Sequence, residues 1–282
     1  MEKIVEINTY PTIKNAIMLC LILLGLNIAL GFLIQIGQTL GFFPNIVLQK
    51  NVVLGLVNIM SFFVVLFIGF KKTKKSFNEV FKFNKVSPNL WCATIIFSFG
   101  LVIIASELDN LLFFLIPMPD FLKQIMDELM VGNLIISVFM IGAVAALTEE
   151  LFFRGLILEG FTNNYTKNKA ILFSALIFGF IHLNPWQFLT AFLFGFITAF
   201  ITIETNSILL PLFIHFFNNS LYTISVKFKD IVSISGFNVY SMNESGFQPA
   251  WFTLSGIFFI MLGSLIFIKW KKNQAPKVSK NL

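Results

Sequence analysis

The hydrophobic residues of this chain are gathered into long blocks that short polar or charged stretches separate. A helix that crosses a bilayer needs about 20 mostly apolar residues. Eight segments meet or approach this length: 15–37, 52–70, 90–112, 134–158, 170–183, 186–203, 207–226 and 250–270. The sequence therefore predicts an all-α fold, a polytopic transmembrane helix bundle with about eight spans.

The fifth and sixth of these segments are short, and only Asn184-Pro185 separates them. Proline lacks a backbone N–H and disfavours helical backbone in the residue before it. The two segments are therefore either two short spans or one broken span, because irregular backbone at membrane depth is tolerated where it is buried in protein or lines a wet cavity.

Composition and charge agree with a membrane protein. Hydrophobic residues make up 57% of the chain and charged residues 12%, whereas a soluble domain carries about 25% charged residues. The net charge is +6, but the lysines lie at the ends of the apolar blocks rather than on a soluble module. This placement predicts contact with the anionic headgroups of a lipid bilayer and no binding of nucleic acid.

The lysines also predict the orientation. If the N-terminus is cytoplasmic and there are eight spans, fifteen of the nineteen lysines fall in cytoplasmic segments, and only Lys50, Lys123, Lys227 and Lys229 fall outside. Because cytoplasmic loops are enriched in Lys and Arg, both termini are expected in the cytoplasm. Three parts follow: N-terminal helices and a cytoplasmic loop in 1–133, a core in 134–226, and an outer loop, last span and basic tail in 227–282.

The fourth predicted span carries three charged residues, Glu149, Glu150 and Arg154, the last being the only arginine of the chain. A charge at the centre of a span costs about 2.5 to 3.5 kcal/mol on insertion scales, so each of these groups needs a partner or a function. Glu150 and Arg154 are four residues apart and can pair on one helix face. Glu149 points about 100° away and is left for another role.

Both histidines of the chain, His182 and His215, also lie in predicted spans, and Asn219 follows His215 by one helical turn. A carboxylate beside a neutral imidazole can deprotonate a water molecule. A second imidazole and an amide can stabilise the oxyanion of a tetrahedral intermediate. Alternatively, Glu149, His182 and His215 are the ligand types of a catalytic zinc site with an open position. The residues alone leave both versions open.

At these positions the chain resembles the CAAX protease and bacteriocin-processing family, also called Abi or type II CAAX prenyl endopeptidase-like. The family shows Glu-Glu-x-x-x-Arg, Phe-x-x-x-His and His-x-x-x-Asn or Asp motifs on separate spans. All three motifs are present in order, and their residues are Glu149, Glu150, Arg154, Phe178, His182, His215 and Asn219. The resemblance covers about 134–226 and implies an intramembrane endopeptidase.

The resemblance also implies a role for each residue. Glu149 and His182 would activate the water, and His215 and Asn219 would stabilise the oxyanion. The remaining three would support the site: Glu150 and Arg154 by holding it together and Phe178 by shaping the pocket wall.

The resemblance also implies which cofactor and which substrate to expect. The family is described both as metalloproteases, which would use zinc or another divalent metal, and as metal-free proteases that depend on a glutamate. Its eukaryotic members cut prenylated CAAX proteins, and its bacterial members relate to bacteriocin immunity, peptide processing or envelope functions. The implied substrate is a membrane-associated peptide or protein, and the composition suits a multi-pass protein of a bacterial plasma membrane.

Two other functions are compatible with charged groups inside spans. A proton-coupled transporter would use them as an ion pathway, and Glu107 and Asp109 in the third predicted span would extend such a path. A non-catalytic immunity or scaffold protein would have kept the fold without the reaction.

Overall fold

The computed structural model describes residues 9–42, 50–228, 234–237 and 246–274, and within them every element of regular secondary structure is a helix. The long helices are α1 (Ile13–Thr39), α2 (Lys50–Thr73), α4 (Pro88–Leu115), α9 (Lys167–Ile181), α10 (Pro185–Thr205), α11 (Leu209–Lys227) and α13 (Ala250–Gln274). A further helix, Leu134–Asn164, is built from five consecutive pieces. The predicted all-α fold is confirmed.

Six of the described helices are long and apolar enough to cross a membrane: Ile13–Thr39, Val52–Thr73, Pro88–Leu115, Leu134–Asn164, Pro185–Thr205 and Ala250–Gln274. The two other predicted spans correspond to α9 and α11. Helix α9 has only 15 residues, and α11 is less apolar because it carries His215 and two asparagines. The protein is a membrane protein with several spans, and the total of eight stays a prediction.

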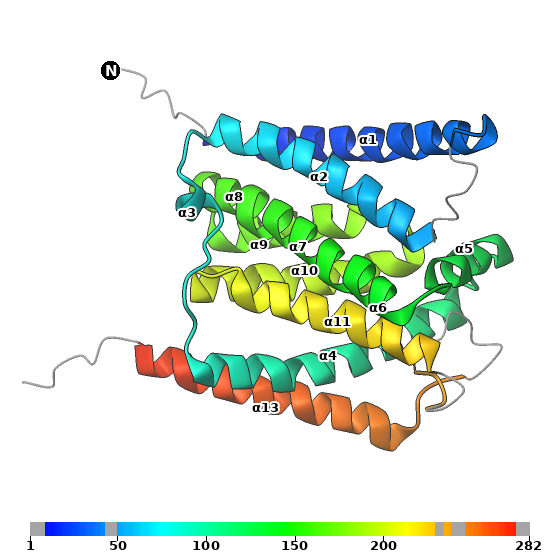
Figure 1. Cartoon of the computed structure of the whole chain (residues 1–282). Helices are drawn as coiled ribbons and strands as arrows, with labels where there is room; N and C mark the ends of the chain where they lie inside the picture. Colours follow the sequence, from blue (N-terminus) through cyan, green and yellow to red (C-terminus); the bar gives the residue numbers. More distant parts are fainter. Residues whose placement is uncertain (1–8, 43–49, 229–233, 238–245, 275–282) are drawn as a thin grey trace, which may run out of the picture.

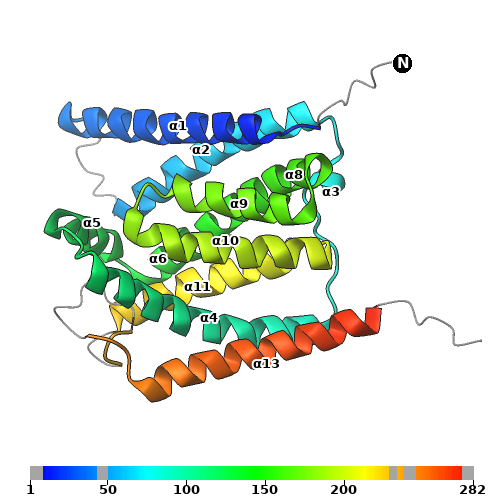
Figure 2. The same ribbon diagram turned by 180° about the vertical axis from the view of Figure 1, so that it is seen from behind.

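The helices lie in three layers (Figures 1 and 2). Helices α1 and α2 form one outer layer, and α4 and α13 form the other. The middle layer holds Leu134–Asn164, α9, α10 and α11, which are the helices that carry every residue singled out by the motifs. The start of α1 and the end of α13 lie at the same end of the bundle (Figure 1).

The fifth and sixth predicted spans are two separate antiparallel helices, α9 and α10, which lie side by side (Figure 2). His182 ends α9, and Leu183 adopts a positive φ of 51° that reverses the chain. Asn184 then caps α10 by accepting a hydrogen bond from the backbone N–H of Trp186 at 3.1 Å, with Pro185 at the first helical position. The turn therefore places His182 at the C-terminal end of the short helix α9.

The fourth span is longer and less regular than the sequence predicts. It comprises α6 (Leu134–Ser137), a π-helical segment η1 (Val138–Val144), α7 (Ala145–Glu150), a second π-helical segment η2 (Leu151–Ile157) and α8 (Leu158–Asn164). The predicted end at residue 158 is wrong, because α8 continues for six residues. Its Glu159 is neutralised by Lys75 and Lys82 at 2.7 and 2.5 Å.

The segment between α2 and α4 runs across one end of the bundle (Figure 1). Its helix α3 (Phe77–Val80) is a single turn. The backbone of Lys82 accepts a hydrogen bond from Ile208 N–H at 3.0 Å, so this segment is tied to the start of α11. At the opposite end lies α5 (Asp120–Met130), which the sequence analysis did not predict. Most of the predicted outer loop 227–249 lies outside the described residues.

The contact between α4 and α13 depends on glycine. A Cβ atom on Gly100 would lie 2.5 Å from the carbonyl oxygen of Gly256 and 2.7 Å from the backbone nitrogen of Ile260. Backbone atoms cannot rotate away, so the two helices would have to separate. Small residues of this kind let transmembrane helices approach closely.

Gly100→Ala is therefore expected to lower the free energy of unfolding by about 1–3 kcal/mol, the usual cost of overpacking. The measurement is reversible unfolding of the purified protein in mixed detergent micelles. Gly25→Ala on α1 is the matched control, because a Cβ there meets nothing within 4 Å. Equal stability of the Gly100→Ala variant and the wild type would contradict the close packing.

Candidate active site

Glu150 is the centre of a buried polar network in the middle layer. Its Oε1 atom lies 3.1 Å from Nη1 of Arg154 and 2.7 Å from Nδ1 of His215. All three side chains are buried. The predicted pairing of Glu150 with Arg154 is confirmed, and the bond to His215 was not predicted. Only His215 is hydrogen-bonded to the carboxylate, and the contact with Arg154 is an ion pair without a hydrogen bond. Burial of this charge is tolerable because both partners are close.

Arg154 has two further neighbours. Its guanidinium carbon lies 4.3 Å from the ring centroid of Phe178, a cation–π contact. Its Nη2 atom donates a hydrogen bond to the hydroxyl oxygen of Thr198 on α10. The arginine is thus fixed by Glu150 in the same helix, by Phe178 on α9 and by Thr198 on α10.

Glu149 is oriented differently from Glu150, as the sequence predicts. Its side chain is 16% exposed, and its Oε2 atom lies 3.9 Å from Nε2 of His215. Among the described residues, no hydrogen-bond partner reaches this oxygen. His215 therefore has one carboxylate bonded to Nδ1 and a second carboxylate facing Nε2.

His182 is half-buried at the end of α9. Its Nδ1 lies 2.7 Å from the carbonyl oxygen of Phe178. Because a carbonyl only accepts, we assign the ring proton to Nδ1 and the free lone pair to Nε2. The Phe178 ring lies between the two imidazoles, with centroids 5.0 Å from His182 and 6.0 Å from His215. No hydrogen bond or ion pair joins His182 to Glu149 in the part of the chain that the structure describes.

Asn219 lies one turn after His215 on α11. Its Nδ2 donates to the carbonyl oxygen of Ile141 at 3.1 Å, within the π-helical segment η1. Its Oδ1 accepts a long bond of 3.4 Å from Asn218. The amide has a second N–H, so the predicted oxyanion role of Asn219 stays a prediction. π-Helical turns are rare and occur often at functional sites, and two of them flank the Glu149-Glu150 pair.

The residues described do not form a three-ligand metal site. No group of three or more His, Cys, Asp or Glu side chains is placed to hold an ion in 9–42, 50–228, 234–237 and 246–274. Glu149 and His215 face each other, but His182 does not join them. The predicted zinc set therefore does not fit the observed arrangement, and we derive no step through a metal.

Glu107, one of the two carboxylates in the predicted extension of an ion path, has structural partners. It accepts from Asn110 at 2.9 Å and from the backbone N–H of Gln248 at 3.0 Å, which ties α4 to the segment before α13. Asp109 lies near Thr190 of α10, but its buried Oδ1 atom has no hydrogen-bond partner among the described residues. Structural contacts thus account for Glu107 without a transport path, and a role of Asp109 in such a path stays a prediction.

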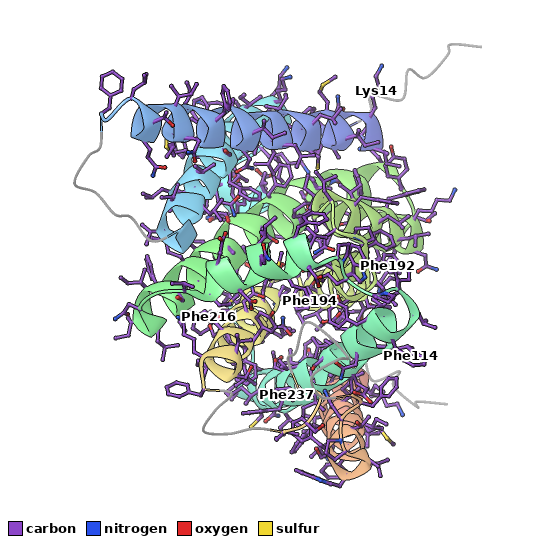
Figure 3. All side chains as sticks on the ribbon, turned by 90° about the vertical axis from the view of Figure 1, so that its right-hand side faces the viewer. Lys14, Phe114, Phe192, Phe194, Phe216 and Phe237 are labelled. Atoms are coloured by element: carbon purple, nitrogen blue, oxygen red, sulfur yellow. The ribbon has the colours of Figure 1, made fainter. Side chains whose placement is uncertain are left out.

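Sequence reasoning missed two contributions of α10. Thr198 binds Arg154, and the Phe194 ring lies edge-on to His215 with centroids 4.9 Å apart. Viewed along the bundle, Phe194 lies among the central helices (Figure 3). Neither residue belongs to a motif, and a threonine or phenylalanine within an apolar block gives no signal of its own.

The fold and the site together define a class: a multi-pass membrane protein with a carboxylate–histidine–arginine network buried among its central helices. Residues 131–221 match the family model described as Type II CAAX prenyl endopeptidase Rce1-like. This segment of the chain is therefore similar to an Rce1-like CAAX prenyl endopeptidase domain, the resemblance that the motifs predicted. This match supports a CAAX-type intramembrane endopeptidase in general.

A curated relative is similar over part of the chain. The "Uncharacterized 24.3 kDa protein" of Escherichia coli is 30% identical over 105 residues, which cover 36% of this chain. The match spans about half, 48%, of that relative's length. No solved structure matches the chain. The matched family segment overlaps the predicted core 134–226, and the three-part division of the chain stays a prediction.

Proposed function

We propose that this protein is an intramembrane endopeptidase that hydrolyses a peptide bond by a water molecule activated at Glu149. The observation that carries the proposal is the Glu149 carboxylate, whose Oε2 has no partner among the described residues and faces Nε2 of His215 at 3.9 Å. A carboxylate inside a membrane bundle is costly without a task. Arg154, the cation that could have neutralised Glu149, is already paired with Glu150.

The two histidines are suited to different tasks because their partners differ. His182 donates its Nδ1–H to a carbonyl, so its Nε2 can accept a hydrogen bond from water. His215 has a carboxylate near each nitrogen, and a carboxylate only accepts hydrogen bonds, so the ring is placed to act as a donor. We therefore assign water activation to Glu149 with His182, and oxyanion stabilisation to His215 with Asn219.

Glu149 takes a proton from the water as the water oxygen attacks the carbonyl carbon of the scissile bond. The carbonyl oxygen becomes an oxyanion, which accepts hydrogen bonds from Nε2 of His215 and from the amide of Asn219. The tetrahedral intermediate then collapses, the C–N bond breaks, and Glu149 returns the proton to the leaving amine. The products are a carboxylic acid, which keeps the second proton of the water, and a free amine; transfer of that proton to the amine gives a carboxylate and an ammonium group.

Glu150, Arg154 and Phe178 would hold this arrangement without touching the reacting atoms. Glu150 orients the His215 ring through Nδ1, and Arg154 neutralises Glu150. Phe178 lies between the two imidazoles and under the guanidinium. Zinc or another divalent metal, which the resemblance allows, would require His182 to move toward Glu149 and His215.

The substrate in this proposal is a membrane-associated peptide or protein, and the location is a bacterial plasma membrane. The matched family is named for CAAX prenyl endopeptidases, which makes a prenylated Cys-a-a-X peptide one probe. An unmodified single-span peptide is the second probe. Cleavage of the second without the first would favour processing of ordinary membrane peptides.

The test uses full-length protein in lipid vesicles with internally quenched versions of both probes. Glu149→Gln keeps the side-chain shape and removes the base, so turnover is expected to fall about 10²- to 10⁴-fold. Glu107→Gln is the matched control: the same change in a carboxylate of α4 that serves a structural contact, with turnover expected at the wild-type level. Wild-type turnover by both Glu149→Gln and His182→Ala would overturn the proposal. A parallel measurement with a chelator, alongside metal analysis, tests the metal.

A further inference from the structure

Helix α10 carries none of the motif residues, yet it contributes a buried hydroxyl group to the network. The Oγ1 atom of Thr198 accepts a hydrogen bond from Nη2 of Arg154. The same hydroxyl lies 2.7 Å from the carbonyl oxygen of Phe194, one turn earlier in the helix, and donates its proton there. Thr198 is fully buried, so water cannot replace this acceptor.

The position of Arg154 determines how the Glu150 carboxylate is divided between Arg154 and His215. Only Oε1 of Glu150 is used, by Arg154 Nη1 and by His215 Nδ1, and Oε2 has no hydrogen-bond partner among the described residues. A guanidinium group prefers to bind a carboxylate through two parallel hydrogen bonds. Nη2 bonds to Thr198 instead of the carboxylate, so Arg154 keeps a single ion-pair contact with Glu150, and its Nη1 atom has no hydrogen-bond partner among the described residues. The hydrogen bond that Oε1 accepts therefore comes from His215.

We propose that Thr198 is a positioning residue of the active site, because its hydroxyl holds Arg154 in the orientation that lets Glu150 fix the His215 ring. The proposal rests on the proposed function for its catalytic consequence, but the ring orientation is a property of the resting protein. A series of hydrogen bonds and ion pairs runs from Phe194 through Thr198, Arg154 and Glu150 to His215. Glu149 faces the other ring nitrogen of His215. Helix α10 is thereby a fourth element of the site.

The first measurement is NMR of the histidine rings, which is simple to interpret because the sequence has two histidines. Full-length protein with ¹⁵N-labelled histidine and a histidine-free affinity tag gives ring signals from His182 and His215 alone, and His182→Gln assigns them. In the wild type, His215 should show one form with a protonated Nδ1. Thr198→Val removes the hydroxyl and keeps the shape, and it should shift or split the His215 signals while those of His182 stay in place.

Two variants separate the hydroxyl from the volume of the side chain. Thr198→Ser keeps the acceptor and should restore the wild-type His215 signals. Thr202→Val makes the same change one turn further along α10, at a buried threonine whose hydroxyl bonds only to the backbone oxygen of Thr198 at 2.8 Å. It should leave His215 unchanged. Wild-type His215 signals in Thr198→Val, or equal shifts in Thr202→Val, would overturn the proposal.

The kinetic measurement uses the quenched single-span and prenylated peptides in vesicles. Thr198→Val should lower kcat about tenfold to a hundredfold, the range for losing one hydrogen bond to a charged group. KM should stay within about twofold, because Thr198 does not touch the substrate, and Thr198→Ser should recover kcat. Unchanged kcat in Thr198→Val contradicts the positioning role. Unchanged turnover in Glu149→Gln contradicts the proposed function instead, and the histidine signals still decide the role of Thr198.

Discussion

Arg154→Met is expected to lower the free energy of unfolding by about 3–5 kcal/mol, the cost of removing one partner from a buried ion pair. Glu150 would keep His215 at Nδ1, but its charge would lose the guanidinium of Arg154, and Phe178 would lose the cation above its ring. Reversible unfolding in mixed detergent micelles measures the effect. The same loss is expected whether or not the protein is active.

The double variant Glu150→Leu with Arg154→Met is the control for this prediction. Replacing both members of a buried pair with apolar residues of similar size is often neutral or stabilising. The double variant should therefore be more stable than Arg154→Met alone, although it is expected to be inactive. If Arg154→Met were as stable as the wild type, Glu150 would not depend on Arg154 for neutralisation.

His215→Gln is expected to lower kcat about 10²- to 10⁴-fold with little loss of stability. The amide N–H₂ of glutamine can still donate a hydrogen bond to Glu150, so the buried carboxylate keeps a partner. The variant loses the Nε2 atom that faces Glu149, and with it the group assigned to the oxyanion. Cleavage of the quenched peptides and thermal unfolding are the two measurements.

His215→Ala separates the two roles of this residue. It removes both the group that faces Glu149 and the donor to Glu150, so activity and stability should fall together. An unpaired acceptor in a buried site costs about 1–3 kcal/mol, and more when it is charged. If His215→Gln turned over substrate like the wild type, His215 would be a packing residue and the assignment of the oxyanion site would be wrong.

The sequence was sufficient to predict the directions of the Glu149 and Glu150 side chains, because helix geometry alone determines them. Residues four apart share a face and adjacent residues do not, so Glu150 meets Arg154 and Glu149 points elsewhere in the structure as well. The bond from His215 to Glu150 could not be predicted in the same way. It joins α7 to α11 across 65 positions, and a periodic pattern carries no information about how two helices face each other.

The number of spans shows a different limit. Hydropathy detects a span by a long run of apolar residues, and two of the helices around the site do not supply one. Helix α11 has too few apolar residues because of positions such as His215 and Asn219, and α9 is too short because the chain turns at His182. Leu134–Asn164 carries both glutamates and is still detected, so the polar residues of the site weaken the signal in some of its helices and not in others.

Thr198 and the π-helical segments were missed for physical reasons too. A threonine within an apolar block is most often satisfied by the carbonyl one turn earlier, and Thr202 and Thr205 on the same helix are bonded in this way. Only the position of Arg154 distinguishes Thr198. A π-helical turn depends on tertiary packing around the fourth span, and no residue of 138–144 or 151–157 marks it.

The two π-helical segments also bear on insertions and deletions. Each such segment holds about one residue more per turn than an α-helix does. The extra residue of η1 can therefore be removed with little change of register, because an ordinary α-helical turn takes its place. Removing one residue from α7, which is already α-helical, would instead rotate everything before it by about 100° relative to Glu149 and Glu150. Ile141 would then leave Asn219, and Met140 would leave Gly55 on α2. Deletions in α7 should therefore be tolerated far less than deletions in η1.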